Sequence, residues 1–340
     1  MPGKSRLLPP SGVEAKGVVM APLVRLLLVF AVVSVGAVVA GFLAAPDGGP
    51  VETFEAVDTA PASPVVTVAI ARPGLLPSLE PETGWWWSPD EPGRGFIIEH
   101  NGAQLVVGAL AYEADGRAAW YLSSGTMHCG SEFTGMLAAY GGGQTLNGRF
   151  RRPTATRDVG RIGIRFLSPT QATVVLPSGR SVALERYRLD GGTRPGFEPE
   201  PGWWWNPAEP GRGFAVEARN GALLLTGVMY DDRGNPVWYV SHGQLDATRS
   251  YRGRWLRLAG GMTMDSGYRV AGDSTDAGAI VLDFVNERVA TLTLPEGKAL
   301  PISRLDLASM PAPLALTVPA VASAPARACA DPIKLAAVSD

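Results

Sequence analysis

Lysine is scarce in this sequence of 340 residues, which contains only Lys4, Lys16, Lys298 and Lys334. Charged residues together make up 18%, and the formal net charge is −2. Nucleic-acid-binding domains normally carry a basic surplus, so this balance argues against a nucleic-acid partner. Arginine supplies most of the positive charge beside abundant alanine, glycine and proline, which indicates a compositional habit of the source rather than phosphate binding.

Histidine and cysteine are also rare. His100, His128 and His242 are the three histidines, and none has a histidine at the matching position of the internal repeat described below. A duplicated zinc site or Ser-His-Asp arrangement is therefore not expected. No glycine-rich phosphate loop stands between a strand and a helix. We predict no metal, no cofactor and no catalytic residue, which favours a binding or structural protein over an enzyme.

The two cysteines, Cys129 and Cys329, lie far apart and do not form a zinc motif. In an oxidising compartment two cysteines commonly pair. A disulfide between them would hold the C-terminal tail against the first half of the chain, and two free thiols are the alternative.

One stretch occurs twice and organises the rest of the chain. Residues 84–96 read GWWWSPDEPGRGF, and residues 202–214 read GWWWNPAEPGRGF. The offset of 118 residues holds without a net insertion as far as Leu189 and Leu307. This indicates a tandem duplication, with one module over residues 84–189 and a second over 202–307. The remaining segments are a leader (1–45), a spacer rich in proline and alanine (46–83), a linker (190–201) and a tail (308–340).

The leader contains twenty uncharged residues from Leu26 to Ala45, preceded by an excess of positive charge. This length is enough for a helix to span a bilayer, and the positive flank would keep the N-terminus inside. A cleaved signal peptide is the alternative, with Met20 as a possible start. Both interpretations place the modules outside the cytoplasm, in the periplasm or at the cell surface, and the first makes the membrane a partner.

Each module is predicted to be a run of short strands. Asn101-Gly102 and Asn220-Gly221 separate apolar runs and predict type I′ hairpins, and further turns are expected at Asp115-Gly116 and Arg233-Gly234. Besides the tryptophan triplet, the strands expected in the first module are 96–100, 103–112, a strand through Trp120-Tyr121, 133–140, 144–150, 159–168, 171–176 and 181–189. We therefore expect an all-β protein in which each module is an antiparallel meander of about eight strands, closed as a barrel, with a sandwich as the alternative.

The motif followed by a hairpin and a Trp-Tyr strand resembles a repeat of exported bacterial proteins of unknown function. The resemblance covers both modules and implies no activity. A Gly-Trp opening before a β-meander is also similar to the avidin and lipocalin (calycin) barrels, which implies a barrel fold.

The tryptophan triplets are the main candidates for binding. On a strand, Trp85 and Trp87 would face one side and Trp86 the other, and the same alternation applies to Trp203, Trp204 and Trp205. Burying one tryptophan removes about 150–250 Å² from water, or roughly 4–6 kcal/mol. The rings outside a module's own core should therefore be covered by the following loop, by the sister module, or by a ligand such as a glycan or a small apolar molecule.

The loop after each triplet carries a glutamate and an arginine at matching positions. Glu91 with Arg94, and Glu209 with Arg212, have a spacing suited to a local ion pair, and contact with a ligand is the alternative. Glycoside hydrolysis needs two carboxyl groups, so pairs of Glu91 with Glu99, or Glu209 with Glu217, constitute the enzyme hypothesis. The competing hypotheses are a non-enzymatic envelope protein that binds through its tryptophans, and a structural protein whose triplets form a module or subunit interface.

Overall fold

The computed structural model describes residues 79–189 and 197–309. The predicted leader, most of the spacer, much of the linker and nearly all of the tail lie outside these residues. Among the described residues no helix is long and apolar enough to cross a membrane.

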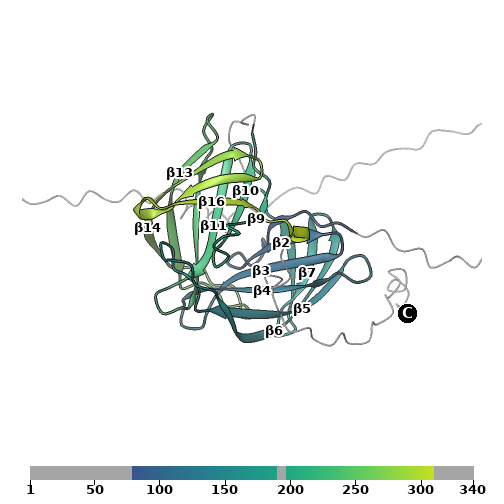
Figure 1. The fold of residues 1–340 in the computed structure, drawn as a ribbon. Helices are drawn as coiled ribbons and strands as arrows, with labels where there is room; N and C mark the ends of the chain where they lie inside the picture. Colours follow the sequence, from purple (N-terminus) through teal and green to yellow (C-terminus); the bar gives the residue numbers. More distant parts are fainter. Residues whose placement is uncertain (1–78, 190–196, 310–340) are drawn as a thin grey trace, which may run out of the picture. The chain divides into compact units, whose positions relative to one another are not determined.

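Residues 84–186 form a closed antiparallel barrel of eight strands (Figure 1). Each strand pairs with the next, and β1 pairs with β8 to close the barrel. The strands are β1 (Gly84–Trp87), β2 (Gly95–Asn101), β3 (Gln104–Tyr112), β4 (Ala118–Thr126), β5 (Glu132–Gly141), β6 (Thr154–Ser168), β7 (Gln171–Val175) and β8 (Ser181–Arg186).

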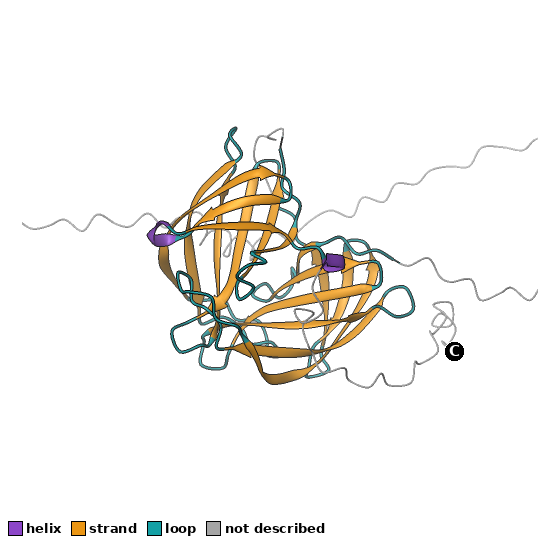
Figure 2. Cartoon of the chain, viewed as in Figure 1, coloured by secondary structure: helices purple, strands orange, loops and turns teal. Residues whose placement is uncertain are grey.

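Residues 202–304 form a second barrel with the same topology (Figure 2). Its strands are β9 (Gly202–Trp205), β10 (Gly213–Arg219), β11 (Ala222–Tyr230), β12 (Pro236–Gln244), β13 (Ser250–Ala259), β14 (Asp273–Asn286), β15 (Val289–Thr293) and β16 (Ala299–Arg304). Two 3₁₀ turns, η1 (Pro295–Gly297) and η2 (Leu307–Ser309), complete the regular structure. The predicted fold class, an all-β chain with two eight-stranded modules, is confirmed.

The hairpin turns follow the sequence signals. Asn220 and Gly221 have φ of 51° and 86°, the positive values that a type I′ turn requires at both central residues. In the first barrel Gly102 has φ of 55°, and the β2–β3 pairing closes directly on this turn.

One predicted strand is wrong. Residues 144–150 form no strand; they belong to a loop between β5 and β6, and residues 260–272 form the matching loop between β13 and β14. We call residues 142–153 and 260–272 the crossing loops, because their backbones bond to the other barrel: Tyr230 N donates to Gln144 O at 3.2 Å, and Tyr112 N donates to Met262 O at 3.0 Å. The apolar alternation in this segment reflects contact with the sister barrel rather than strand pairing.

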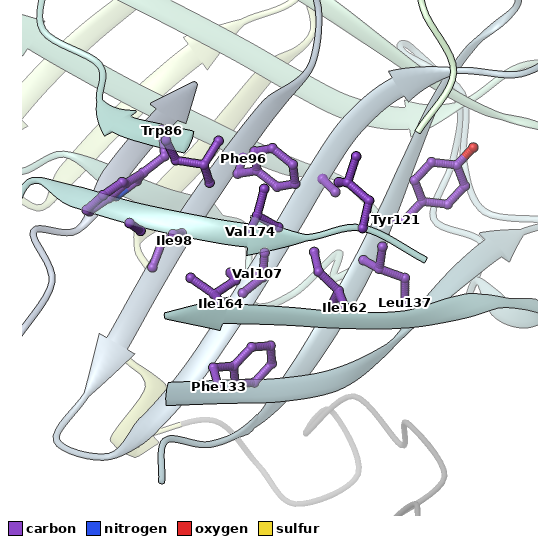
Figure 3. Close-up of a cluster of buried hydrophobic side chains, with 14 of the residues drawn as sticks. Trp86, Phe96, Ile98, Val107, Tyr121, Phe133, Leu137, Ile162, Ile164 and Val174 are labelled. Atoms are coloured by element: carbon purple, nitrogen blue, oxygen red, sulfur yellow. The ribbon is translucent and has the colours of Figure 1, made fainter. Parts of the chain in front are cut away.

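Side chains from the inner faces of the strands pack together inside each barrel. In the first barrel the buried cluster includes Trp86, Phe96, Phe133 and Ile164 (Figure 3). The second barrel has an equivalent cluster around Trp204, Phe214 and Tyr251. Eight-stranded barrels have an interior that side chains can fill, and these apolar interiors provide each module with its own hydrophobic core.

Candidate functional site: the repeated motif between the barrels

Both barrels belong to one compact unit of the chain, and the repeated motif lies where they meet. The central tryptophan of each triplet points into its own barrel. Trp86 and Trp204 are fully buried, and each donates its ring N–H to a backbone oxygen just before the motif, Glu82 O at 2.9 Å and Glu200 O at 3.0 Å. These two rings are core residues and not part of a binding surface.

The first tryptophan of each triplet lies on the opposite face of its strand, as alternation predicts, and its backbone bonds to the other barrel. Trp85 N donates to Glu217 Oε2 at 3.2 Å, and Trp203 N donates to Glu99 Oε2 at the same distance. Glu99 on β2 and Glu217 on β10 occupy matching positions of the two copies. The motif therefore forms a reciprocal contact, with the geometry of a two-fold dimer interface inside one chain.

Each of these glutamates also forms an ion pair with an arginine of the other barrel. Arg186 Nη2 lies 2.8 Å from Glu217 Oε1, and Arg304 Nη2 lies 2.6 Å from Glu99 Oε1. The two arginines end β8 and β16, the strands that close the barrels, and each also donates to the carbonyl of its own Trp85 or Trp203 at 3.0 Å. The bonded arginine and glutamate thus hold both backbone groups of one tryptophan, the arginine its carbonyl and the glutamate its N–H.

These ion pairs are buried. Glu99 is 4% exposed and Glu217 is 5% exposed. Burial raises the pKa of both carboxyl groups and outweighs the lowering by Arg304 and Arg186 respectively. Because removing charges from water is unfavourable, a buried pair depends strongly on both partners being present.

Aromatic side chains extend the contact in the same reciprocal way. Trp120 on β4 donates its ring N–H to Met229 O at 2.9 Å, and Trp238 on β12 donates to Ala111 O at 3.0 Å. Trp120 also meets the ring of Tyr230 edge to face at 5.4 Å, as Trp238 meets Tyr112. All four aromatic residues are buried but belong to neither barrel core, so the sister barrel is what covers them.

The predicted local ion pairs of the motif loops are present. Glu91 pairs with Arg94, and also with Arg180 from the β7–β8 turn. The hydrogen bond from Arg180 is the largest cause that lowers the pKa of Glu91, and Arg94 acts in the same direction.

The second motif loop repeats this arrangement with a lysine in place of Arg180. Glu209 pairs with Arg212 and with Lys298. Burial acts to raise the pKa of Glu209, but the hydrogen bonds and charges of Lys298 and Arg212 together outweigh it, so the pKa is lowered.

The motif arginines also hold the crossing loops. Arg94 Nη1 donates to Met264 O at 2.8 Å, and Arg212 Nη1 donates to Leu146 O at 2.6 Å. The side chains of Met264 and Leu146 then enter the core of the barrel to which they do not belong. Each barrel is therefore completed by one apolar side chain from the other.

The two copies differ where Trp85 and Trp203 meet the sister barrel. The ring of Trp203 lies over Gly108 of β3, where an added Cβ would come within 2.3 Å of Trp203 Cζ2. The position that matches Gly108 is Thr226, which is fully buried. Trp85 instead lies against Gly95 of its own barrel, where an added Cβ would come within 2.0 Å of Trp85 Cζ3. Trp203 is accordingly buried, whereas Trp85 is half-buried.

The third tryptophan of each triplet stays partly open in both copies. Trp87 and Trp205 are half-buried, and Trp87 meets Tyr187 edge to face at 5.7 Å. Of the six predicted binding tryptophans, these two and Trp85 are partly exposed, whereas Trp86, Trp203 and Trp204 are buried.

The other chemistry-bearing residues form no common site. Among the described residues no group of His, Cys, Asp and Glu has a metal-binding arrangement. His242 is half-buried, and burial lowers its pKa. Cys129 is disulfide-bonded, and Cys329, the only other cysteine in the sequence, lies outside the described residues.

Sequence reasoning missed Arg186, Arg304, Trp120 and Trp238 as interface residues. Their signal was available, because each arginine and each tryptophan recurs at the offset of 118 residues. A repeat comparison that marks identical charged and aromatic positions would have found them.

No family model, curated protein or solved structure matches the chain.

Proposed function

We propose that this chain is a non-enzymatic structural or interaction protein of the cell envelope, in which the repeated motif clamps two barrels into one body. The observation that carries the proposal is the reciprocal contact of the motif: the backbone N–H of Trp85 and Trp203, and the guanidinium groups of Arg186 and Arg304, all bond to a glutamate of the sister barrel. Conserving such a contact in both copies is expected when the motif's role is assembly.

The compartment is supported by two independent features. The leader is typical of an exported or membrane-anchored protein. Disulfides persist in oxidising environments outside the cytoplasm, and Cys129 is disulfide-bonded.

The placement of the carboxyl groups favours this function over glycoside hydrolysis. Glu99 and Glu217 are buried between the barrels and paired with arginine. Glu91 and Glu209 are each held by two cationic side chains. A general acid must reach the glycosidic oxygen, and carboxyl groups sealed in an interface do not.

The test separates the clamp from a ligand platform by comparing the first and third tryptophans of the triplets. Trp203→Ala should lower the free energy of unfolding by about 3–5 kcal/mol in urea denaturation, because it empties a buried position between the barrels. Trp205→Ala is the matched control and should have a much smaller effect. Intrinsic tryptophan fluorescence of the unmodified protein should not respond to oligosaccharides or peptidoglycan fragments.

A fluorescence response that Trp87→Ala or Trp205→Ala abolishes would favour the second candidate, recognition of a glycan or small apolar ligand. The observation behind this candidate is the partial exposure of these two rings, with Tyr187 beside Trp87.

A further inference from the structure

The tips of the two crossing loops expose an aromatic side chain at matching positions. Phe150 is 42% exposed and Tyr268 is 44% exposed. A single exposed apolar side chain is common on a protein surface and needs no explanation. The surroundings of Phe150 make the first tip distinctive.

Three arginines surround Phe150 in the sequence, Arg149, Arg151 and Arg152, and all three are exposed. None of them forms an ion pair with another described residue. The crossing loop 142–153 contains no acidic residue. A tip with three unpaired positive charges stands out on a chain whose net charge is −2.

The second tip lacks most of this charge. Gly267 and Val270 stand where the first loop has Arg149 and Arg152. Its remaining arginine, Arg269, donates to Gly261 O at 2.7 Å within the same loop. The chain therefore contains an internal reference: an equivalent loop with an exposed aromatic ring but without free arginines.

Contacts with the second barrel and within the loop fix the backbone next to the first tip. Leu146 is inserted in the core of the second barrel, Arg212 bonds to its carbonyl at 2.6 Å, and Arg151 N donates to Gln144 Oε1 at 3.3 Å. The loop therefore presents Phe150 and its arginines without having to order a free segment, which would reduce the affinity of a contact.

We propose that the tip formed by Arg149, Phe150, Arg151 and Arg152 docks on an anionic lipid bilayer, with the arginines at the headgroups and the Phe150 ring at the edge of the acyl region. The bilayer would be a partner in the structural role proposed above. The proposal rests on that role, because the contact between the barrels positions the loop. Basic side chains near an anionic surface contribute about 1 kcal/mol each, and an apolar ring adds buried area.

A bilayer fits these observations better than an acidic polymer. An isolated phenyl ring offers no hydrogen bond to a polysaccharide, whereas it gains by leaving water at a bilayer. The chain also supplies proximity: with residues 26–45 in a membrane, the spacer 46–83 keeps the first barrel within roughly 130 Å of the bilayer.

The experiment measures amide hydrogen exchange of the full-length protein on two kinds of vesicle, phosphatidylcholine alone and phosphatidylcholine mixed with phosphatidylglycerol. The expected result is slower exchange in residues 142–153 on the anionic vesicles only, with residues 260–272 unchanged. This readout is local, so insertion of the leader does not produce it. Added salt should reverse the protection, because screening weakens surface electrostatics.

Matched variants test the residues. Replacing Arg149, Arg151 and Arg152 with alanine should reduce the docked population about a hundredfold, which is about fivefold for each arginine. The control variant replaces Arg161, Arg219 and Arg252, which are exposed arginines elsewhere with the same total charge, and should keep the protection. Phe150→Ser should weaken it, whereas Tyr268→Ser should not.

The proposal is overturned if residues 142–153 exchange equally on both vesicles, or if the control triple variant loses as much protection as the loop variant. It is also overturned if a soluble acidic polysaccharide protects the loop and Phe150→Ser has no effect. An unchanged thermal unfolding curve of each variant shows that the clamp is intact, so these outcomes are distinct from a failure of the proposed function.

Discussion

The two barrels repeat the same contacts across their interface, and one exception there is informative. The ion pairs, the tryptophan N–H bonds and the loop insertions all recur at matching positions. The exception is the first tryptophan ring of each triplet, which lies over Gly108 of the sister barrel for Trp203 and against Gly95 of its own barrel for Trp85. Trp203 lies across the sister strand because Gly108 has no side chain, while Trp85 packs against its own Gly95. Nearly identical motif sequences thus place the first tryptophan ring differently in the two copies.

The difference teaches that the glutamate and arginine, and not the tryptophan ring, define the common part of the interface. The backbone of Trp85 and of Trp203 is held in the same way in both copies, although their rings are not. The ring fills the space that the sister barrel leaves, whereas the buried charges pair with matching partners in both copies.

The strongest way to break the equivalence of the two barrels is to remove one buried carboxylate. Glu217→Ala removes the nearest carboxylate of the buried Arg186, leaving only Glu82 at 3.8 Å, and should lower the free energy of unfolding by about 3–5 kcal/mol, as measured by urea denaturation. Glu99→Ala should have an effect of similar size. Arg117→Ala, which breaks an exposed pair with Asp115, is the control and should change stability by about 0–1 kcal/mol. A loss for Glu217→Ala within the range of this control would contradict the clamp.

A smaller change exchanges the residues that distinguish the barrels. Gly108→Thr places a side chain where the Trp203 ring lies, so we expect a loss of about 1–3 kcal/mol and greater quenching of tryptophan fluorescence by acrylamide. Thr226→Gly makes the reciprocal change at the matching buried position, and we expect it to leave the quenching of Trp203 unchanged. If Gly108→Thr left both the unfolding curve and the quenching unchanged, contact with Gly108 would not be what buries Trp203.

The smallest expected effect is a difference in pH dependence between the motif loops and the interface. The pKa of Glu91 and of Glu209 lies below the usual 4.5, and that of Glu99 and of Glu217 lies above it. The loop pairs therefore add stability above the unfolded-state pKa and lose it as the pH falls through the lowered pKa.

The interface glutamates have the opposite sign, because the folded protein binds their protons more readily than the unfolded chain does. Their contribution to stability falls as the pH rises from the unfolded-state pKa to the raised folded pKa. Carboxyl-carbon NMR titration, assigned with single Glu→Gln variants, measures the four pKa values. A pKa for Glu99 or Glu217 below that of Glu91 would contradict this assignment.

The fold could be predicted from sequence because its signals are local. Asn220-Gly221 requires a hairpin, and the strict alternation of β8, with Val182 and Leu184 inward, requires a strand with one buried face. Because the repeat offset is constant, the strands predicted for the first module also predict those of the second. The prediction of a strand at 144–150 was wrong because Leu146 packs in the core of the other barrel. A local sequence pattern does not show which core an apolar side chain enters.

The candidate site was predicted only in its local parts. The pairing of Glu91 with Arg94 depends on three residues of separation. The partners of Glu99 and Glu217 lie far along the chain in the opposite barrel, so their contacts depend on how two finished barrels meet. The sequence pattern pointed to both glutamates, but as the carboxyl pair of the hydrolase hypothesis and not as interface residues.

The exchange of Leu146 and Met264 between the barrels has an evolutionary consequence. Each barrel contains an apolar side chain supplied by the other. Deleting either barrel would therefore remove one side chain from the core of the barrel that remains. Selection would then act against loss of either copy. Substitutions in one copy are then constrained by the contacting residues of the other, and the two copies stay together in one chain.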